Sequence, residues 1–130
     1  AAMIFPDKKV ISVCGDGGFM MNSQELETAV RLGVNLTVVI LNDKAYGMVK
    51  WKQENMKFSD FGLSFENPDF VKYAEAYGAK GYRINNAENL TETLETCLNS
   101  AGVNVIDCPV DYSENDKILN KDLKKISSSL

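Results

Sequence analysis

The chain has 130 residues, of which 45% are hydrophobic and 25% charged, and its formal net charge is −4. These values are typical of one globular domain with a modest core. The basic residues are scattered rather than clustered, which argues against nucleic acid as a partner. No run approaches the roughly 18 consecutive apolar positions of a membrane span, so we expect no membrane partner.

The residue types that are missing narrow the chemistry. The chain contains no histidine, so it cannot by itself supply a Ser-His-Asp triad, a Cys-His pair or the commonest zinc ligand. Its three cysteines, Cys14, Cys97 and Cys108, form no CxxC pair, and two of them lie in apolar runs where a thiol acts as a small hydrophobe. We therefore expect a reducing, cytoplasmic setting, and chemistry that comes from carboxylates, a cofactor or another chain.

The first half of the chain has the pattern of a strand, a helix and a second strand. An apolar run from Lys9 to Cys14 ends in glycines, as a buried parallel strand can. Asn22 or Ser23 is expected to cap the helix that follows, and Gly33 to end it. The β-branched segment "LTVVIL", from Leu36 to Leu41, is the strongest predicted strand. A strand, helix and strand of this length imply a right-handed parallel crossover.

The second half repeats the alternation. We expect helices at about 46–55, from Asn67-Pro68 to Gly78 and at about 90–101, strands at 81–84 and 103–110, and a terminal helix and tail at 116–130 with Ile118, Leu119, Leu123 and Ile126 on its apolar side. The pattern predicts a doubly wound, mainly parallel α/β sheet with helices on both faces. Residues 1–130 contain no internal repeat or dividing linker, so we expect a single domain, and its opening resembles the end of a helix cut from a longer chain.

An irregular segment between two predicted helices is rich in aromatic residues. It carries Phe58, Phe61 and Phe65. Together with the apolar start at Met3 to Phe5, these rings are expected to be covered by absent domains or another subunit. The alternative is that they pack inward on their own domain.

Carboxylates follow both strong strands. Gly15-Asp16-Gly17-Gly18 ends the first strand, and Asn42-Asp43 ends the second. Ligands of such sheets bind beyond the carboxyl ends of the strands, so the two carboxylates converge if the strands are neighbours. Magnesium commonly takes one or two carboxylates and completes its shell with phosphate, carbonyl and water oxygens, and the glycines would let the backbone approach a phosphate. The alternative is that these motifs are an ordinary turn and loop.

These motifs resemble a known signature. Gly15-Asp16-Gly17 followed by Asn42-Asp43 is similar to the GDG and NN or ND motif of thiamine-diphosphate-dependent enzymes. The longer segments "CGDGGFMMNSQELETAVRLGVNLTVVILNDKAYGMVKWKQ", "NPDFVKYAEAYGA" and "VIDCPVDYSEN" resemble the C-terminal cofactor-binding domain of the acetolactate synthase family. The resemblance covers Lys9 to Asn115.

The resemblance implies a magnesium site made of the Asp16 and Asp43 side chains and the Ala45 backbone carbonyl. It also implies that Gly17 and Gly18 bind the diphosphate of thiamine diphosphate through their N–H groups. The residues implied to form the cofactor site are Gly15, Asp16, Gly17, Gly18, Asn42, Asp43, Ala45, Tyr46 and Gly47, with Asn42 as a structural hydrogen-bonding residue. No catalytic residue is expected in this chain, because the family's activating glutamate comes from the N-terminal domain of another subunit.

On the substrate side the resemblance points to Met48 and Val49, although Met48 is also interpreted equally well as a packing residue. Related pyruvate decarboxylases have a glutamate where Val49 stands. An apolar residue there implies carboligation, in which two pyruvates condense to 2-acetolactate with loss of CO2. The implied parent is a homo-oligomer, a dimer or tetramer. The resemblance leaves FAD dependence and the second keto acid open, and the isolated chain is expected to be inactive.

Two other interpretations stay open at this point. One is another thiamine-diphosphate-dependent 2-keto-acid decarboxylase. The other is a non-catalytic module that captures a phosphate-bearing ligand. The product of the parent protein separates the two enzymes, and the gene boundary upstream of Ala1 separates a fragment from a stand-alone module.

Overall fold

A parallel sheet forms the centre of the molecule. A computed structural model of the chain describes residues 1–115, 117–118 and 122–127. The strands are β1 (Val10–Gly15), β2 (Leu36–Asn42), β3 (Lys80–Arg83) and β4 (Val103–Pro109), which pair in parallel in the order β1-β2-β4-β3. The helices are α1 (Asp16–Met21), α2 (Glu25–Arg31), α3 (Gly47–Asn55), α4 (Phe70–Ala76), α5 (Asn89–Asn99) and α6 (Leu123–Ser127).

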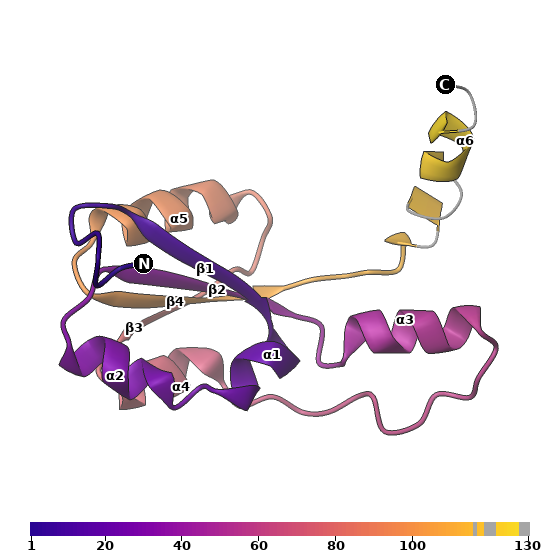
Figure 1. Cartoon of the computed structure of the whole chain (residues 1–130), viewed down its shortest axis with the longest axis horizontal. Coiled ribbons are helices and arrows are strands. Elements are labelled where there is room, and N and C mark those ends of the chain that lie inside the picture. Colours follow the sequence, from indigo (N-terminus) through magenta and orange to yellow (C-terminus); the bar gives the residue numbers. More distant parts are fainter. Residues whose placement is uncertain (116, 119–121, 128–130) are drawn as a thin grey trace.

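Helices cover both faces of this sheet (Figure 1). The chain moves outward from β1 through β2 to β3, with α2 and α4 in the connections, and then returns to β4 through α5. Right-handed crossovers place helices of the outward path on one face and the helix of the return path on the other. Figure 1 accordingly shows α5 on one side and α1, α2 and α4 on the opposite side. The predicted α/β fold with helices on both faces is confirmed.

The core has two parts, one on each face of the sheet. The first fills the space between the sheet and the pair α2 and α4, and consists of Leu26, Val38, Ile40, Phe70, Ala74, Ala79, Val103 and Val105. The second lies under α5 and consists of Val39, Ile84, Cys97 and Ile106. Successive residues of a strand point to opposite faces, so β2 contributes side chains to both parts of the core. This explains why its sequence is apolar without alternation.

The structure corrects two predicted helix starts. Neither Asn22 nor Ser23 caps α2 through its side chain; Ser23 is buried and its Oγ accepts a hydrogen bond from the Tyr73 hydroxyl at 2.7 Å. The helix predicted to open at Asn67-Pro68 begins at Phe70. Asp69 caps it by accepting hydrogen bonds from two backbone N–H groups of the first turn, which would otherwise lack partners.

The outcome for the three phenylalanines is divided. Phe58 and Phe61 are 59% and 86% exposed. Phe65 packs its edge on Tyr46, with ring centroids 5.0 Å apart, so the inward-packing alternative holds for this ring. The two exposed rings leave an apolar surface beside α3.

The predicted terminal helix is present in part, as α6. Ile118, Leu123 and Ile126 are exposed, while Leu119 lies outside the described residues. No helix in the part of the chain that the structure describes has the length and apolar character needed to cross a membrane.

Candidate functional site

The carboxyl ends of the two strong strands lie side by side. In the parallel pairing of β1 with β2, Gly15 is opposite Leu41. The residues that follow therefore meet at one edge of the sheet, where they surround a hollow of about 380 Å³. The hollow is lined by Gly15, Asp16, Gly17, Gly18, Leu41, Asp43, Ala45, Tyr46, Gly47, Met48, Val49, Tyr112 and Asn115. Of the site residues predicted from the sequence, only Asn42 is missing from this lining.

Asp16 is the most enclosed polar group of the hollow, with 1% of its surface exposed. Its Oδ1 accepts a hydrogen bond from the Gly17 N–H at 2.8 Å. Its Oδ2 accepts two, from the Lys44 N–H at 2.8 Å and from Asn67 Nδ2 at 2.6 Å. Both oxygens of this buried carboxylate therefore have hydrogen-bond donors, none of which belongs to a cationic side chain.

Asp43 lies in a less favourable environment for a negative charge. Its Oδ1 accepts one hydrogen bond, from the Ala45 N–H at 3.2 Å. Burial raises the pKa of Asp43, and the negative charge of Asp16 raises it further. Its Oδ2 lies against Gly47, where a Cβ would clash with it. Two neighbouring carboxylates that repel each other form a setting in which a cation is stabilised.

Replacing Asp43 with asparagine is therefore expected to stabilise the cation-free chain. A raised pKa means that the folded state holds the proton more tightly than the unfolded state, so ionisation of Asp43 lowers stability as the pH rises through its folded pKa. At pH 7, in the presence of EDTA, Asp43→Asn should raise the midpoint of thermal unfolding by about 2 °C.

The comparison with the starting protein at two pH values provides the control for Asp43→Asn. Below about pH 4 the starting protein also carries a neutral side chain at this position, so the difference should disappear. A midpoint at pH 7 equal to or below that of the starting protein would contradict the repulsion.

The glycines of the first motif have different surroundings. A Cβ on Gly17 would lie 2.7 Å from the Tyr46 ring, so only glycine leaves room for this ring. A Cβ on Gly18 would meet nothing within 4 Å, which leaves its backbone open to the hollow. Gly17 is thus required by packing, whereas Gly18 lies in open space.

The loop after β2 is held by the irregular segment that follows α3. Tyr46 N–H donates to the Leu63 carbonyl at 2.9 Å, and Phe65 N–H donates to the Lys44 carbonyl at 3.0 Å. These two bonds flank an antiparallel bridge between Ala45 and Ser64. The segment predicted as irregular therefore fixes the backbone of the loop that carries Asp43 and Ala45.

The donors available to a cation are few and are all oxygens. The described residues contain no cluster of three or more His, Cys, Asp or Glu side chains that could hold a metal by themselves. Two carboxylates and a nearby backbone carbonyl fit Mg²⁺, which binds through one or two carboxylates and takes its remaining ligands from phosphates and water. The residues present therefore fit a magnesium diphosphate better than a metal held by protein alone.

Several residues of the site were not predicted from the sequence. Tyr112 and Asn115 line the hollow from the segment after β4. Burial raises the pKa of the Tyr112 hydroxyl, with contributions from the charges of Asp43 and Asp16. Asn67 reaches Asp16 from a loop 51 residues away in sequence. The only signal for these residues was their presence in the segments "VIDCPVDYSEN" and "NPDFVKYAEAYGA".

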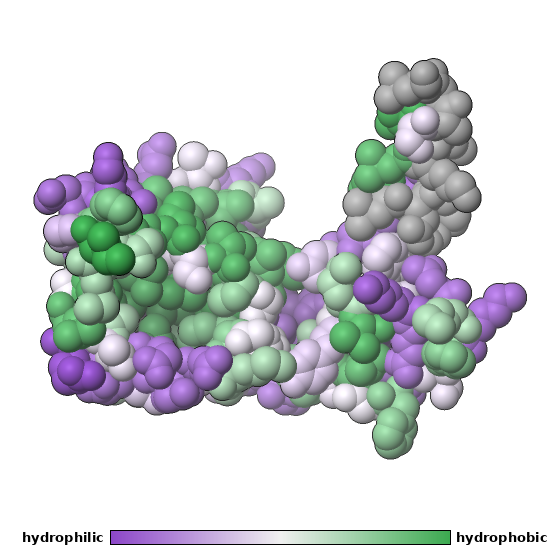
Figure 2. Space-filling model, viewed as in Figure 1, coloured by the Kyte–Doolittle hydropathy of each residue, from purple (hydrophilic) through white to green (hydrophobic). Residues whose placement is uncertain are grey.

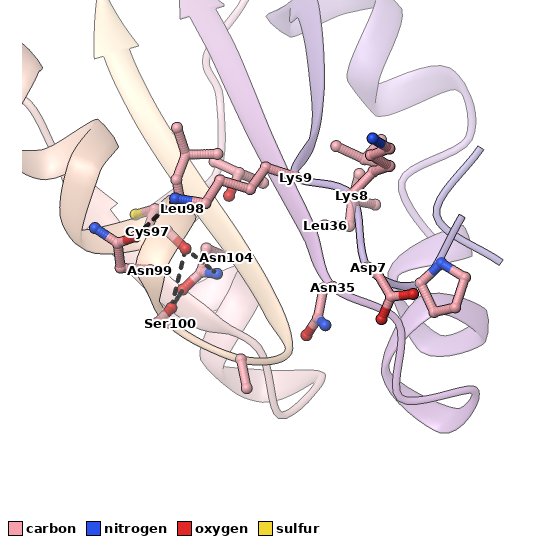
Figure 3. Close-up of a pocket in the computed structure, with 14 residues that line it drawn as sticks. Asp7, Lys8, Lys9, Asn35, Leu36, Cys97, Leu98, Asn99, Ser100 and Asn104 are labelled. Atoms are coloured by element: carbon pink, nitrogen blue, oxygen red, sulfur yellow. Dashed lines mark hydrogen bonds between the residues drawn. The ribbon is translucent and has the colours of Figure 1, made fainter. Parts of the chain in front are cut away.

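A second hollow, of about 230 Å³, lies at the opposite end of the sheet (Figure 3). Several of its polar side chains bond to one another. Ser100 Oγ donates to Asn104 Oδ1 at 2.8 Å, and Lys9 Nζ donates to Asn99 Oδ1 at 2.7 Å. Asn104, which is buried, also donates to the Cys97 carbonyl at 3.2 Å. These contacts engage Lys9, Ser100 and Asn104, and we assign no ligand to this hollow.

Comparison with known proteins identifies the family. A family model described as "Thiamine pyrophosphate enzyme, C-terminal TPP binding domain" matches residues 1–108. The chain belongs to this family. It is 41% identical over 125 residues to the acetolactate synthase of Bacillus subtilis (strain 168), a match that covers 96% of this chain and 22% of that protein. It is 40% identical over 121 residues to the catabolic acetolactate synthase of Raoultella terrigena, covering 93% of this chain and 22% of that protein.

A solved structure agrees with this assignment. The thiamine diphosphate-dependent 4-hydroxybenzoylformate decarboxylase of Rhodococcus jostii RHA1 superposes with a TM-score of 0.82 and 27% identity, over 88% of this chain and 22% of that chain. This chain therefore spans about a fifth of the length of these relatives. The resemblance to thiamine-diphosphate enzymes, and to acetolactate synthases among them, is confirmed.

Proposed function

We propose that this chain is the diphosphate-binding domain of an acetolactate synthase-like enzyme that condenses two pyruvates to 2-acetolactate with loss of CO2. The observation that carries the proposal is the convergence of Asp16 and Asp43 at one edge of the sheet, in a chain of the thiamine-diphosphate-binding family. Both carboxylates line a hollow in which nearly all the residues implied by the family motif come together.

The hydrogen bonds of the site support a role for each proposed ligand atom. Asp16 Oδ2 already accepts two hydrogen bonds, whereas Oδ1 accepts one, so Oδ1 has a lone pair for Mg²⁺. Asp43 and the Ala45 carbonyl would complete the protein's share of the shell. The Gly17 N–H is already donated to Asp16 Oδ1, so of the two glycines expected to bind the diphosphate it is Gly18, with its open backbone, that would do so. Thiamine diphosphate, when bound, supplies the electron sink for decarboxylation of a 2-keto acid.

The substrate side of the hollow is apolar. Met48 and Val49 line it and are 60% and 54% exposed, so their side chains are accessible to a bound molecule. An apolar Val49 offers no acid to protonate the product of decarboxylation. This favours attack on a second pyruvate over release of an aldehyde. The activating glutamate would come from a domain outside this chain, in a homo-oligomer.

The cysteines are consistent with the proposed cytoplasmic location. Cys14, Cys97 and Cys108 are all free in the structure. Burial raises the pKa of each thiol, which keeps the thiols protonated and unreactive. Reduced, inert cysteines of this kind are typical of a reducing compartment.

The product identifies the reaction. The full-length protein, incubated with pyruvate, Mg²⁺ and thiamine diphosphate, is expected to release CO2 and accumulate 2-acetolactate as its main product. Acetaldehyde as the dominant product would replace this proposal with a 2-keto-acid decarboxylase. The Rhodococcus relative is named as a decarboxylase. Omitting thiamine diphosphate is the control, and it should abolish both products.

A further inference from the structure

A row of polar side chains connects Asp16 to the opposite edge of the sheet. Arg83 Nε donates to Asp107 Oδ2 at 2.9 Å, and Asn42 Nδ2 donates to Asp107 Oδ1 at 2.8 Å. Asn67 Nδ2 donates to Asn42 Oδ1 at 3.0 Å and to Asp16 Oδ2 at 2.6 Å. These contacts join the ends of β3, β4, β2 and β1 in their order across the sheet.

Chemistry fixes the direction of every hydrogen bond in this row. Ionised Asp107, which is 1% exposed, can only accept, so Asn42 must turn its NH2 group toward it and its carbonyl oxygen toward Asn67. Ionised Asp16 at the other end can also only accept. Asn67 therefore has to present its NH2 group to both neighbours, and both of its amide hydrogens are used. A carboxylate or an apolar side chain at position 67 could not make these two bonds.

This arrangement decides which oxygen of Asp16 remains available. The two hydrogen bonds from Lys44 N–H and Asn67 occupy Oδ2, while Oδ1 keeps one free lone pair. A carboxylate held in this way can bind a cation through one oxygen only. Without the bond from Asn67, Oδ2 would regain a lone pair and the carboxylate could bind through both oxygens.

We propose that Asn67 is a positioning residue that makes Asp16 a one-oxygen ligand and thereby favours Mg²⁺ over Ca²⁺ at this site. The inference rests on the proposed function. Mg²⁺ requires a nearly ideal octahedron with short bonds, which single-oxygen ligands provide. Ca²⁺ accepts six to eight ligands and readily takes both oxygens of one carboxylate. Asn67 thus acts through Asp16 rather than by touching the cation.

The test is a measurement of cation preference in the full-length protein. Dissociation constants for Mg²⁺ and Ca²⁺ are measured by calorimetric titration with saturating thiamine diphosphate. Asn67→Leu, which keeps the size of the side chain but removes both donors, is expected to weaken Mg²⁺ binding at least about tenfold. Ca²⁺ binding should weaken less than about threefold, so the preference for Mg²⁺ falls. Asn67→Ser has one short donor, so its preference for Mg²⁺ should lie between those of the unmodified protein and Asn67→Leu. This second variant also provides the test if Asn67→Leu does not fold.

Arg83→Met is the matched control. It breaks the same row of hydrogen bonds at its other end, where Asp107 is buried, and leaves the bond between Asn67 and Asp16 in place. It should lower the midpoint of thermal unfolding without changing the ratio of the two dissociation constants. An unchanged ratio in folded Asn67→Leu or Asn67→Ser, or an equal change in Arg83→Met, would overturn the proposal. Absence of Mg²⁺ binding in the unmodified protein would instead overturn the proposed function on which it rests.

Discussion

Replacing Asp16 with alanine is expected to weaken cofactor binding and to destabilise the fold at the same time. The change removes an anionic ligand of the proposed magnesium site, so affinity for thiamine diphosphate in excess Mg²⁺ should fall at least about tenfold in the full-length protein. It also leaves the N–H groups of Gly17, Lys44 and Asn67 without their acceptor. Unsatisfied buried donors cost about 1–3 kcal/mol each, and with partial access of water we expect a total loss of about 2–4 kcal/mol.

Two further variants separate these effects of Asp16. Asp16→Asn keeps the shape and one acceptor oxygen, so it should lose cofactor affinity with a smaller loss of stability. Glu95→Ala removes an exposed carboxylate from α5, far from the hollow, and should change neither quantity. Calorimetric titration and denaturant unfolding measure the two effects. Unchanged affinity in Asp16→Ala would remove this residue from the proposed site.

The parts of the fold that follow from local pattern were predictable. β2 is apolar without a break from Val38 to Leu41 because it contributes to the core on both faces of the sheet, and its neighbours alternate with helices of ordinary length. The site followed from the same pattern, since parallel strands that are neighbours must bring their carboxyl ends together. The closeness of Asp16 and Asp43 could therefore be predicted from the two strands and the motifs that follow them.

Helix α1 was missed for a physical reason. It begins at Asp16 and contains Gly17 and Gly18, which are poor helix formers, so the local sequence favours a turn. Packing overrides this preference. The centroid of the Phe19 ring lies 5.6 Å from that of Phe70 and 6.2 Å from that of Tyr73, and both pairs pack edge to face. The helix depends on contacts with α4, which no local pattern reveals.

Asn67 was missed because its partner is remote in sequence. As part of Asn67-Pro68 it has the composition of a helix start, and Pro is common in a first turn. In the structure its side chain is already bonded to Asp16 and Asn42, and Asp69 takes the capping role. The local pattern correctly located a helix here but gave no information about the side chain that points back to the site.

The structure exposes apolar residues both on β1 and near α3. Ile11 and Val13 of β1 are 45% and 62% exposed although they lie in an apolar strand, and β1 pairs with β2 alone among the described residues. Figure 2 shows hydrophobic residues gathered over the strands on this side of the molecule and further ones near α3. Near α3, Phe58 and Phe61 are exposed as well. We therefore expect this exposed apolar surface to be in contact with other protein.

The isolated chain of residues 1–130 is therefore expected to fold, to self-associate weakly and not to turn over pyruvate. Its two-part core supports cooperative unfolding, while its exposed apolar residues favour association that sedimentation at increasing concentration can measure. Turnover should be absent because no residue of this chain matches the family's activating glutamate, although both carboxylates of the proposed magnesium site are present. The purified chain, given thiamine diphosphate, Mg²⁺ and pyruvate, is assayed for CO2 beside the full-length protein as the positive control. Sustained multiple turnover by the chain alone would mean that one of its own carboxylates activates the cofactor, and that Asp16 and Asp43 are not both ligands.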